Sequence, residues 1–191
     1  MRCSVLLALL MLAPFPSAAQ KIPPATRPSE ANAPIIPPSP RRRAPIVAQV
    51  YVGEGAPDFE LDGSRGRPVQ LSSLRGTWIV LAFADRRQSL AGLRAIHPEL
   101  GALGAQLVGV CHEKPGTLVS SSRRDSLPFL MLADVTGEIS AMYGLYDLDR
   151  SATVPGFLVL DRQGVVRMAV LGKQLPSTDI SRLARLAITG L

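Results

Sequence analysis

Residues 78–104 read WIVLAFADRRQSLAGLRAIHPELGALG, and this stretch decides the fold. It opens with an unbroken apolar run over residues 78–83, which has the length of a strand buried on both faces of a sheet. Apolar side chains then return at helical spacing, at Leu93, Ile96, Leu100 and Leu103. The stretch therefore predicts a buried strand followed by an amphipathic helix over residues 89–104, kinked near Pro98.

Segments on both sides of this stretch continue the alternation of strands and helices. Residues 56–61 and 69–71 alternate apolar and polar side chains around a glycine-rich turn, which predicts a hairpin. This order predicts an α/β fold with a central mixed β-sheet, helices on both faces and an N-terminal hairpin. The further strands are predicted over residues 106–111, 129–132, 156–160 and 165–171, and the further helices over 117–125 and 177–188, the last capped by Ser177 or Thr178.

The first 49 residues differ in composition from the rest of the chain. Arg2, the apolar run that follows it and the small residues Ser17–Ala19 are typical of a secretory signal peptide over residues 1–19. Such a signal predicts export to the periplasm or the extracellular space. Residues 20–49 contain eight prolines, which favour an extended, semi-stiff linker. The rest of the chain has the length of one domain, over residues 50–191.

The excess positive charge is concentrated in the linker. The formal charge is +6 at pH 7, yet residues 50–191 carry 15 basic and 14 acidic side chains. Residues 20–49 carry five basic side chains and one acidic one, with Arg41, Arg42 and Arg43 in a row. This run predicts a weak contact with an anionic membrane surface, and the alternative is a solvated tether. The domain has no basic stripe interleaved with aromatic side chains, so we expect no nucleic-acid partner.

Cysteine and histidine are scarce. The cysteines are Cys3, which leaves with the signal, and Cys111. A single remaining cysteine can form neither an internal disulfide nor a cysteine-based metal site. His97 and His112 have no cluster of ligand-type residues near them, and we expect His97 to be a partly exposed helix residue. The sequence therefore predicts no metal and no cofactor.

Four segments stand out by their order and spacing: GAPDFEL at Gly55–Leu61, VQLSSLRG at Val69–Gly76, the apolar strand at Trp78–Phe83, and VPGFLVLDRQG at Val154–Gly164. Together they resemble the redoxin group, which comprises the AhpC/TSA peroxiredoxins and the exported, thioredoxin-like thiol reductases. The resemblance covers nearly the whole domain. It implies a thioredoxin-like fold.

The chain departs from the redoxin pattern where that group has its active site. In the thiol-reductase branch the helix opens with Cys-Pro-Pro-Cys-Arg-Ala, and the matching run here is Leu90-Ala91-Gly92-Leu93-Arg94-Ala95. In an alignment on peroxiredoxins, their peroxidatic cysteine falls at or beside Gly92. Redoxin chemistry needs a thiolate stabilised at a helix N-terminus, which neither leucine nor glycine can provide. The resemblance thus implies a degenerate member that lacks the active-site cysteines.

The same resemblance implies a binding edge. Pro155 looks like the cis-proline that flanks the bound peptide in thioredoxins, whereas peroxiredoxins have an arginine near this position. We therefore expect a cis bond between Val154 and Pro155. We also expect an apolar groove of Leu90 and Leu93 beside it, which would receive a protein or peptide partner. The alternative is that both leucines turn inward and fill the core.

Cys111 is the remaining candidate for thiol chemistry. It ends a strand predicted to run parallel to residues 78–83, and ligand sites in such sheets gather at the carboxyl ends of the strands. Against a reactive role, a lone buried cysteine is commonly just a small apolar residue. His112 would moreover point to the opposite face if the strand continued.

The other polar candidates have structural interpretations. We expect Asp85, Arg86 and Arg87 to form a solvated loop, and the alternative is an anion site at the start of the following helix. Asp134 and Asp161 have turn-like flanks, so we expect them to begin loops and not to form a carboxylate pair.

Three functional hypotheses follow. The first is an exported, catalytically degenerate redoxin that acts as a binding module. The second is a thiol oxidoreductase or peroxiredoxin-like antioxidant protein that uses Cys111 with an external thiol. The third is a structural envelope protein that acts through its basic linker.

We predict that the exported protein is cleaved after Ala19, because small residues precede that bond and an apolar run precedes them. N-terminal sequencing of the protein from the cell envelope should begin at Gln20. A mature chain that begins at Met1 would contradict this prediction.

Overall fold

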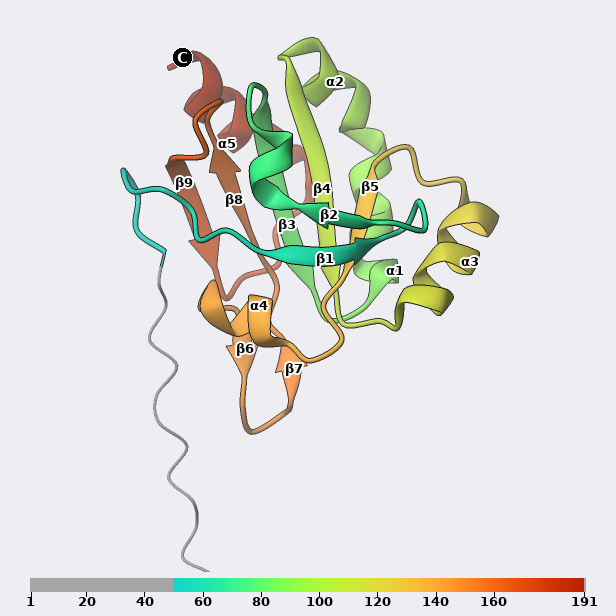
Figure 1. The fold of residues 1–191 in the computed structure, drawn as a ribbon. Helices are drawn as coiled ribbons and strands as arrows, with labels where there is room; N and C mark the ends of the chain where they lie inside the picture. Colours follow the sequence, from blue (N-terminus) through green and yellow to red (C-terminus); the bar gives the residue numbers. More distant parts are fainter. Residues whose placement is uncertain (1–49, 191) are drawn as a thin grey trace, which may run out of the picture. The chain divides into compact units, whose positions relative to one another are not determined.

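The computed structural model describes residues 50–190. The predicted signal and linker, with Arg41, Arg42 and Arg43, lie outside the described residues. Seven strands form one mixed sheet in which neighbours are antiparallel except for three parallel central strands. The strands are β1 (Glu60–Gly63), β2 (Pro68–Gln70), β3 (Trp78–Ala84), β4 (Ala105–Cys111), β5 (Leu130–Ala133), β8 (Gly156–Leu160) and β9 (Val166–Leu171). Their order across the sheet is β2-β1-β5-β4-β3-β8-β9 (Figure 1), and the parallel strands are β3, β4 and β5.

The central strand β3 is buried on both faces, and its side chains divide the core into two halves. Successive side chains of a strand point to opposite faces, so a continuous apolar run supplies both. One half receives Val80, Ala82 and Ala84, and the other receives Ile79, Leu81 and Phe83.

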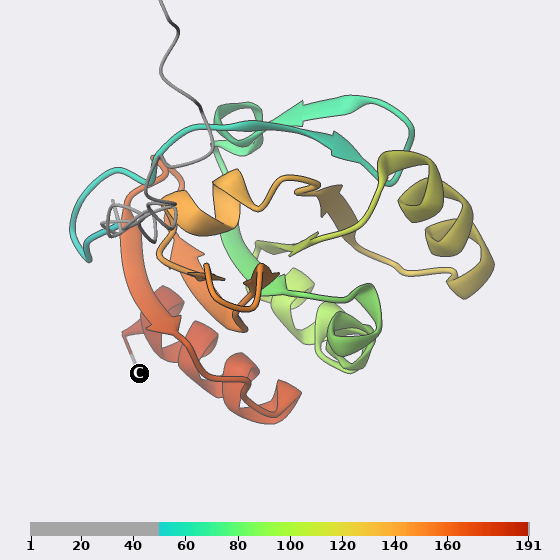
Figure 2. The same ribbon diagram turned by 90° about the horizontal axis from the view of Figure 1, so that it is seen from below.

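Helices cover both faces of the sheet (Figure 2). The helices on the first face are α1 (Arg87–Leu90), the 3₁₀ helix η3 (Ala91–Ala95), α2 (His97–Ala102), α3 (Pro115–Asp125) and α5 (Ser177–Thr189). The second face is covered by the 3₁₀ helix η2 (Leu71–Leu74) and by α4 (Glu138–Met142). The predicted α/β fold with a central mixed sheet and an N-terminal hairpin is therefore confirmed. Within residues 50–190 no helix is both long enough and apolar enough to cross a membrane.

The helix predicted over residues 89–104 is divided into α1, η3 and α2. Proline has no backbone N–H, and its ring clashes with the carbonyl four residues earlier, here that of Arg94. The chain responds with a 3₁₀-type bond in which the amide of Ile96 donates to the carbonyl of Leu93 at 3.2 Å. The irregular region begins at Ala91, so it is longer than the predicted kink at Pro98.

The last helix begins as predicted, but its predicted cap is wrong. Ser177 is the first residue of α5, Pro176 precedes it, and no side chain caps the helix. Proline is tolerated there because the first amides of a helix have no intrahelical partner.

The segment between β5 and β8 contains elements that the sequence did not predict. These are α4 and a small hairpin of β6 (Tyr146–Asp147) and β7 (Ala152–Thr153), all too short to show a periodic pattern. Gly137 precedes α4 with φ at 73°, and a Cβ on it would lie 2.1 Å from the ring of Tyr146. Only glycine fits this close approach.

Both loop aspartates are confirmed as structural. Asp134 Oδ2 accepts hydrogen bonds from the amide and the hydroxyl of Ser140, each at 2.7 Å. Asp161 Oδ1 accepts from the amides of Gln163 and Val165, each at 2.9 Å. Burial alone would raise the pKa of Asp161, but the Val165 amide, the Arg167 guanidinium and the Gln163 amide together hold that pKa below its usual value.

We predict that the domain loses stability in acid in part because the Asp161 carboxylate becomes protonated. Its pKa is lowered in the folded state, so its contribution is present above the unfolded-state pKa of about 3.9 and is lost as pH falls through the folded-state value. Urea midpoints measured from about pH 5 down to about pH 2 should fall less steeply for Asp161→Asn than for the unchanged protein. Identical slopes would contradict the assignment.

Candidate functional site

A small pocket lies at the carboxyl end of β3, where α1 begins. Its volume is about 40 Å³, and it is enclosed by the end of β3, α1 and η3, the start of β8, and the loop between β9 and α5. Three of the four residues predicted to form a binding edge line it: Leu90, Leu93 and Pro155. Val154 does not line it. The other lining residues are Ala82, Phe83, Ala84, Ser89, Gly156, Phe157, Lys173, Gln174, Leu175 and Ile180.

Both leucines of this pocket are buried. Leu90 is 4% exposed and Leu93 is 5% exposed, and both pack in the core on the first face of the sheet. The structure therefore agrees with the core-filling interpretation, and the two side chains form the inner wall of the pocket. Neither side chain protrudes from the protein surface, so a partner could contact them only through the opening of the pocket.

The cis geometry expected before Pro155 is wrong. Every peptide bond among the described residues is trans, including the bond between Val154 and Pro155. The amide of Val154 donates to the carbonyl of Leu145 at 2.8 Å, and β8 begins directly after Pro155. The trans form is the ordinary preference of such bonds, and here the chain enters β8 without departing from it.

Cys111 ends β4, beside Ala84 of the parallel strand β3, as predicted. The side chain is fully buried, and its Sγ lies 3.8 Å from the carbonyl oxygen of Leu132. Burial, and secondarily the charge of Glu113, raise the pKa of Cys111 to about 12. The sulfur is thus a neutral thiol at physiological pH, and it does not line the pocket.

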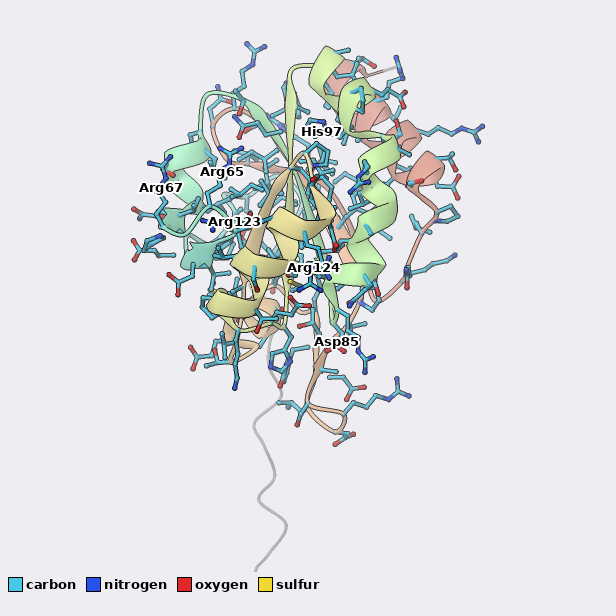
Figure 3. The ribbon with its side chains drawn as sticks, turned by 90° about the vertical axis from the view of Figure 1, so that its right-hand side faces the viewer. Arg65, Arg67, Asp85, His97, Arg123 and Arg124 are labelled. Carbon is cyan, nitrogen blue, oxygen red and sulfur yellow. The ribbon has the colours of Figure 1, made fainter. Side chains whose placement is uncertain are left out.

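Neither histidine is placed to activate Cys111. His112 faces Asp85, and 3.9 Å separate His112 Nδ1 from Asp85 Oδ1. Both side chains are partly exposed. His97 lies on α2 beside Phe129, with 6.4 Å between ring centroids. Figure 3 shows Asp85 and His97 well apart on this side of the domain. Residues 50–190 contain no cluster of three or more potential metal ligands among their His, Cys, Asp and Glu side chains.

The prediction that Arg87 lies in a solvated loop is wrong. The residue is only 8% exposed, and its Nη1 donates to the carboxylate of Asp125 at the end of α3. Its Nε lies 3.9 Å from Glu113. This guanidinium therefore ties α1 to α3. Asp125 follows Arg87 by 38 positions and Glu113 follows it by 26, so no local sequence pattern could have revealed these partners.

Comparison with known proteins places this geometry in a family context. Residues 52–169 match the model of the AhpC/TSA family. The chain is 28% identical over 158 residues to chloroplastic peroxiredoxin Q of Sedum lineare, a match that covers 78% of this chain and 84% of the relative. It is 27% identical over 156 residues to peroxiredoxin 2 of Thermoplasma acidophilum, covering 70% of this chain and 73% of the relative.

Solved structures agree on the fold. The peroxidoxin BcpB of Mycobacterium tuberculosis superposes with a TM-score of 0.66 at 18% identity, covering 74% of this chain and 98% of its own. AhpC of Enterococcus faecalis gives a TM-score of 0.64 at 15% identity, covering 74% and 97%. The thioredoxin-like fold implied by the sequence is therefore confirmed.

Truncation of either pocket leucine should destabilise the domain, because both fill core. We expect Leu90→Ala and Leu93→Ala each to lower the free energy of unfolding by about 2–5 kcal/mol. Leu186→Ala is the control, since Leu186 is 47% exposed, and it should change that free energy by no more than about 0.5 kcal/mol. Urea unfolding followed by circular dichroism measures all three. Losses at Leu90 and Leu93 as small as the control's would contradict their burial.

Cys111 should resist thiol reagents in the folded protein. Its pKa of about 12 leaves almost no thiolate at neutral pH, and the side chain is inaccessible. A chain with Cys3→Ser should stay unlabelled by iodoacetamide in mass spectra until it is unfolded. The control adds Gly92→Cys and Cys111→Ser to that chain, because a side chain at Gly92 would meet open space. Labelling of Cys111 as fast as Cys at position 92 would overturn the prediction.

Proposed function

The chain belongs to the AhpC/TSA family, and from this premise we propose that it is an exported member in which binding has replaced thiol chemistry. In this proposal the pocket at the start of α1 receives an extended segment of a protein or peptide. The observation that carries it is the composition of the pocket. Its inner wall is Leu90 and Leu93, and no lining residue is a cysteine.

The residues of the pocket suit apolar contact better than reaction. Thiol-based redox catalysis needs a sulfur that forms a thiolate in contact with substrate. Here the one cysteine thiol of the described residues is buried and neutral. The pocket instead offers leucine, phenylalanine and proline walls with Ser89, Lys173 and Gln174 as polar neighbours. Its small volume suits the tip of one apolar side chain while the rest of a peptide lies across the mouth.

A phage-displayed library of short random peptides, selected on the full chain, tests this proposal. Affinity of an enriched peptide is then measured by calorimetry. Ser89→Phe should abolish it, because Ser89 is exposed and lines the pocket. Gln88→Phe is the matched control, since Gln88 is its exposed neighbour but does not line the pocket, and it should bind normally. Failure to enrich any peptide, or equal affinities of the two variants, would refute binding at this pocket.

A thiol peroxidase remains the second candidate, because the relatives are named peroxiredoxins and Cys111 lies at the carboxyl edge of the sheet. The Cys111 thiolate would attack one oxygen of hydrogen peroxide and break its O–O bond, which leaves a sulfenic acid and a hydroxide that takes up a proton to become water. An external thiol would condense with the sulfenic acid, releasing a second water, and another would reduce the mixed disulfide. This route requires local opening around Cys111.

Peroxide consumption with dithiothreitol as reductant separates the two candidates. Under the binding proposal, the protein and its Cys111→Ser variant should both match the rate of buffer alone. Consumption above that rate, lost in Cys111→Ser, would establish the second candidate.

The contact of Arg41, Arg42 and Arg43 with anionic membranes also remains a proposal. Deletion of residues 20–49 should abolish binding to phosphatidylglycerol vesicles if that contact exists.

A further inference from the structure

A second hollow lies at the opposite end of β3 from the pocket. It is a groove of about 410 Å³ that includes Trp78 at the start of β3, residues of the turn between β8 and β9, and the C-terminal part of α5. Figure 1 shows these three segments at the same end of the sheet. The lining residues are Trp78, Asp161, Arg162, Gln163, Arg167 and Ala187. We infer that this groove binds a small aromatic anion, such as an aryl phosphate or an aryl carboxylate.

The groove is more positive than the domain around it. Arg162 and Arg167 line it, and Asp161 is the one carboxylate among its lining residues. Arg75 lies close to the same turn, because its Nε is 3.2 Å from the point where a Cβ on Gly164 would stand. Two guanidinium groups thus line the groove beside one buried carboxylate, whereas residues 50–191 as a whole carry 15 basic and 14 acidic side chains. This local excess attracts anions.

Arg167 is held in place before any ligand arrives. Its Nε and Nη2 both contact Asp161 Oδ2, each at 2.7 Å. The side chain of Asp161 is 4% exposed, whereas that of Arg167 is 51% exposed. The third guanidinium nitrogen, Nη1, has no partner among the described residues. A fixed, partly exposed guanidinium loses little conformational entropy when it binds a phosphate or a carboxylate, which favours affinity.

Trp78 gives the groove its preference for a planar group. It is the only tryptophan of the chain, it is partly exposed, and it packs against the core on the side of α5. An indole presents a flat, polarisable surface on which aromatic rings stack, and arginine adds cation–π attraction to such rings. The volume lies in the range of small-molecule sites, which begins at roughly 300 Å³. Aromatic surface beside fixed positive charge therefore selects a ring that carries an anion.

Titration of the full chain with phenyl phosphate tests the inference. The readout is the indole N–H resonance in ¹H–¹⁵N NMR spectra, which comes from Trp78 alone because the chain has one tryptophan. We expect a saturable shift with a dissociation constant of about 1 mM or below. Inorganic phosphate offers only the anion, and benzyl alcohol offers only the aromatic ring. Each should therefore bind at least about tenfold more weakly than phenyl phosphate. No saturable shift with phenyl phosphate, or equal affinity for benzyl alcohol, would overturn the inference.

Arginine variants locate the binding. Arg162→Gln with Arg75→Gln should weaken phenyl phosphate binding at least about tenfold, since each removes a charged donor. Both side chains are exposed and have no ion pair among the described residues, so the fold should persist. Arg65→Gln with Arg67→Gln removes the same charge at the turn between β1 and β2 (Figure 3) and should leave the affinity unchanged. Equal affinities of the two double variants would refute the groove as the site.

Discussion

The burial of β3 between β4 and β8 is the constraint on which the rest of the structure depends. Val80, Leu81 and their neighbours have almost no exposed surface, and alternate side chains feed the two halves of the core. A strand buried on both faces needs neighbours on both edges and helices on both faces, because its backbone and side chains otherwise meet water. The neighbouring strands β4 and β8 and the helical layers on both faces meet this requirement.

The two ends of β3 differ in chemistry. At its carboxyl end the chain turns into α1, where redoxins carry their cysteines, and here Leu90 and Leu93 fill the space. At its amino end Trp78 lines a groove together with the turn between β8 and β9, where Asp161 orders an arginine. The first end is packed with buried apolar side chains. The second end has the fixed charge and the aromatic surface that recognition of a small ligand needs.

Buried polar groups fix the ends of three helices and one turn. Arg87 joins the start of α1 to the end of α3 through Asp125. Asp134 holds the start of α4 through Ser140, and Asp161 holds the last hairpin. Asp134 and Asp161 accept hydrogen bonds from the amides of a helix start and a turn, whereas Arg87 Nε has no hydrogen-bond partner among the described residues. Removal of one partner would leave the other buried without a hydrogen bond, which costs free energy of folding.

The sequence by itself determined the strands of the seven-stranded sheet, the fold class and the presence of a single cysteine, Cys111, in residues 50–191. Apolar runs and residue identity are local properties, and a buried strand such as Trp78–Ala84 leaves a clear local pattern. The tertiary structure alone decided that Leu90 and Leu93 are buried, that Arg87 is not solvated and that the bond before Pro155 is trans. It also decided that Trp78 and Arg167, 89 positions apart, line the same groove. These outcomes depend on contacts between distant segments, and the free energy of such contacts outweighs the local preferences that a sequence pattern records.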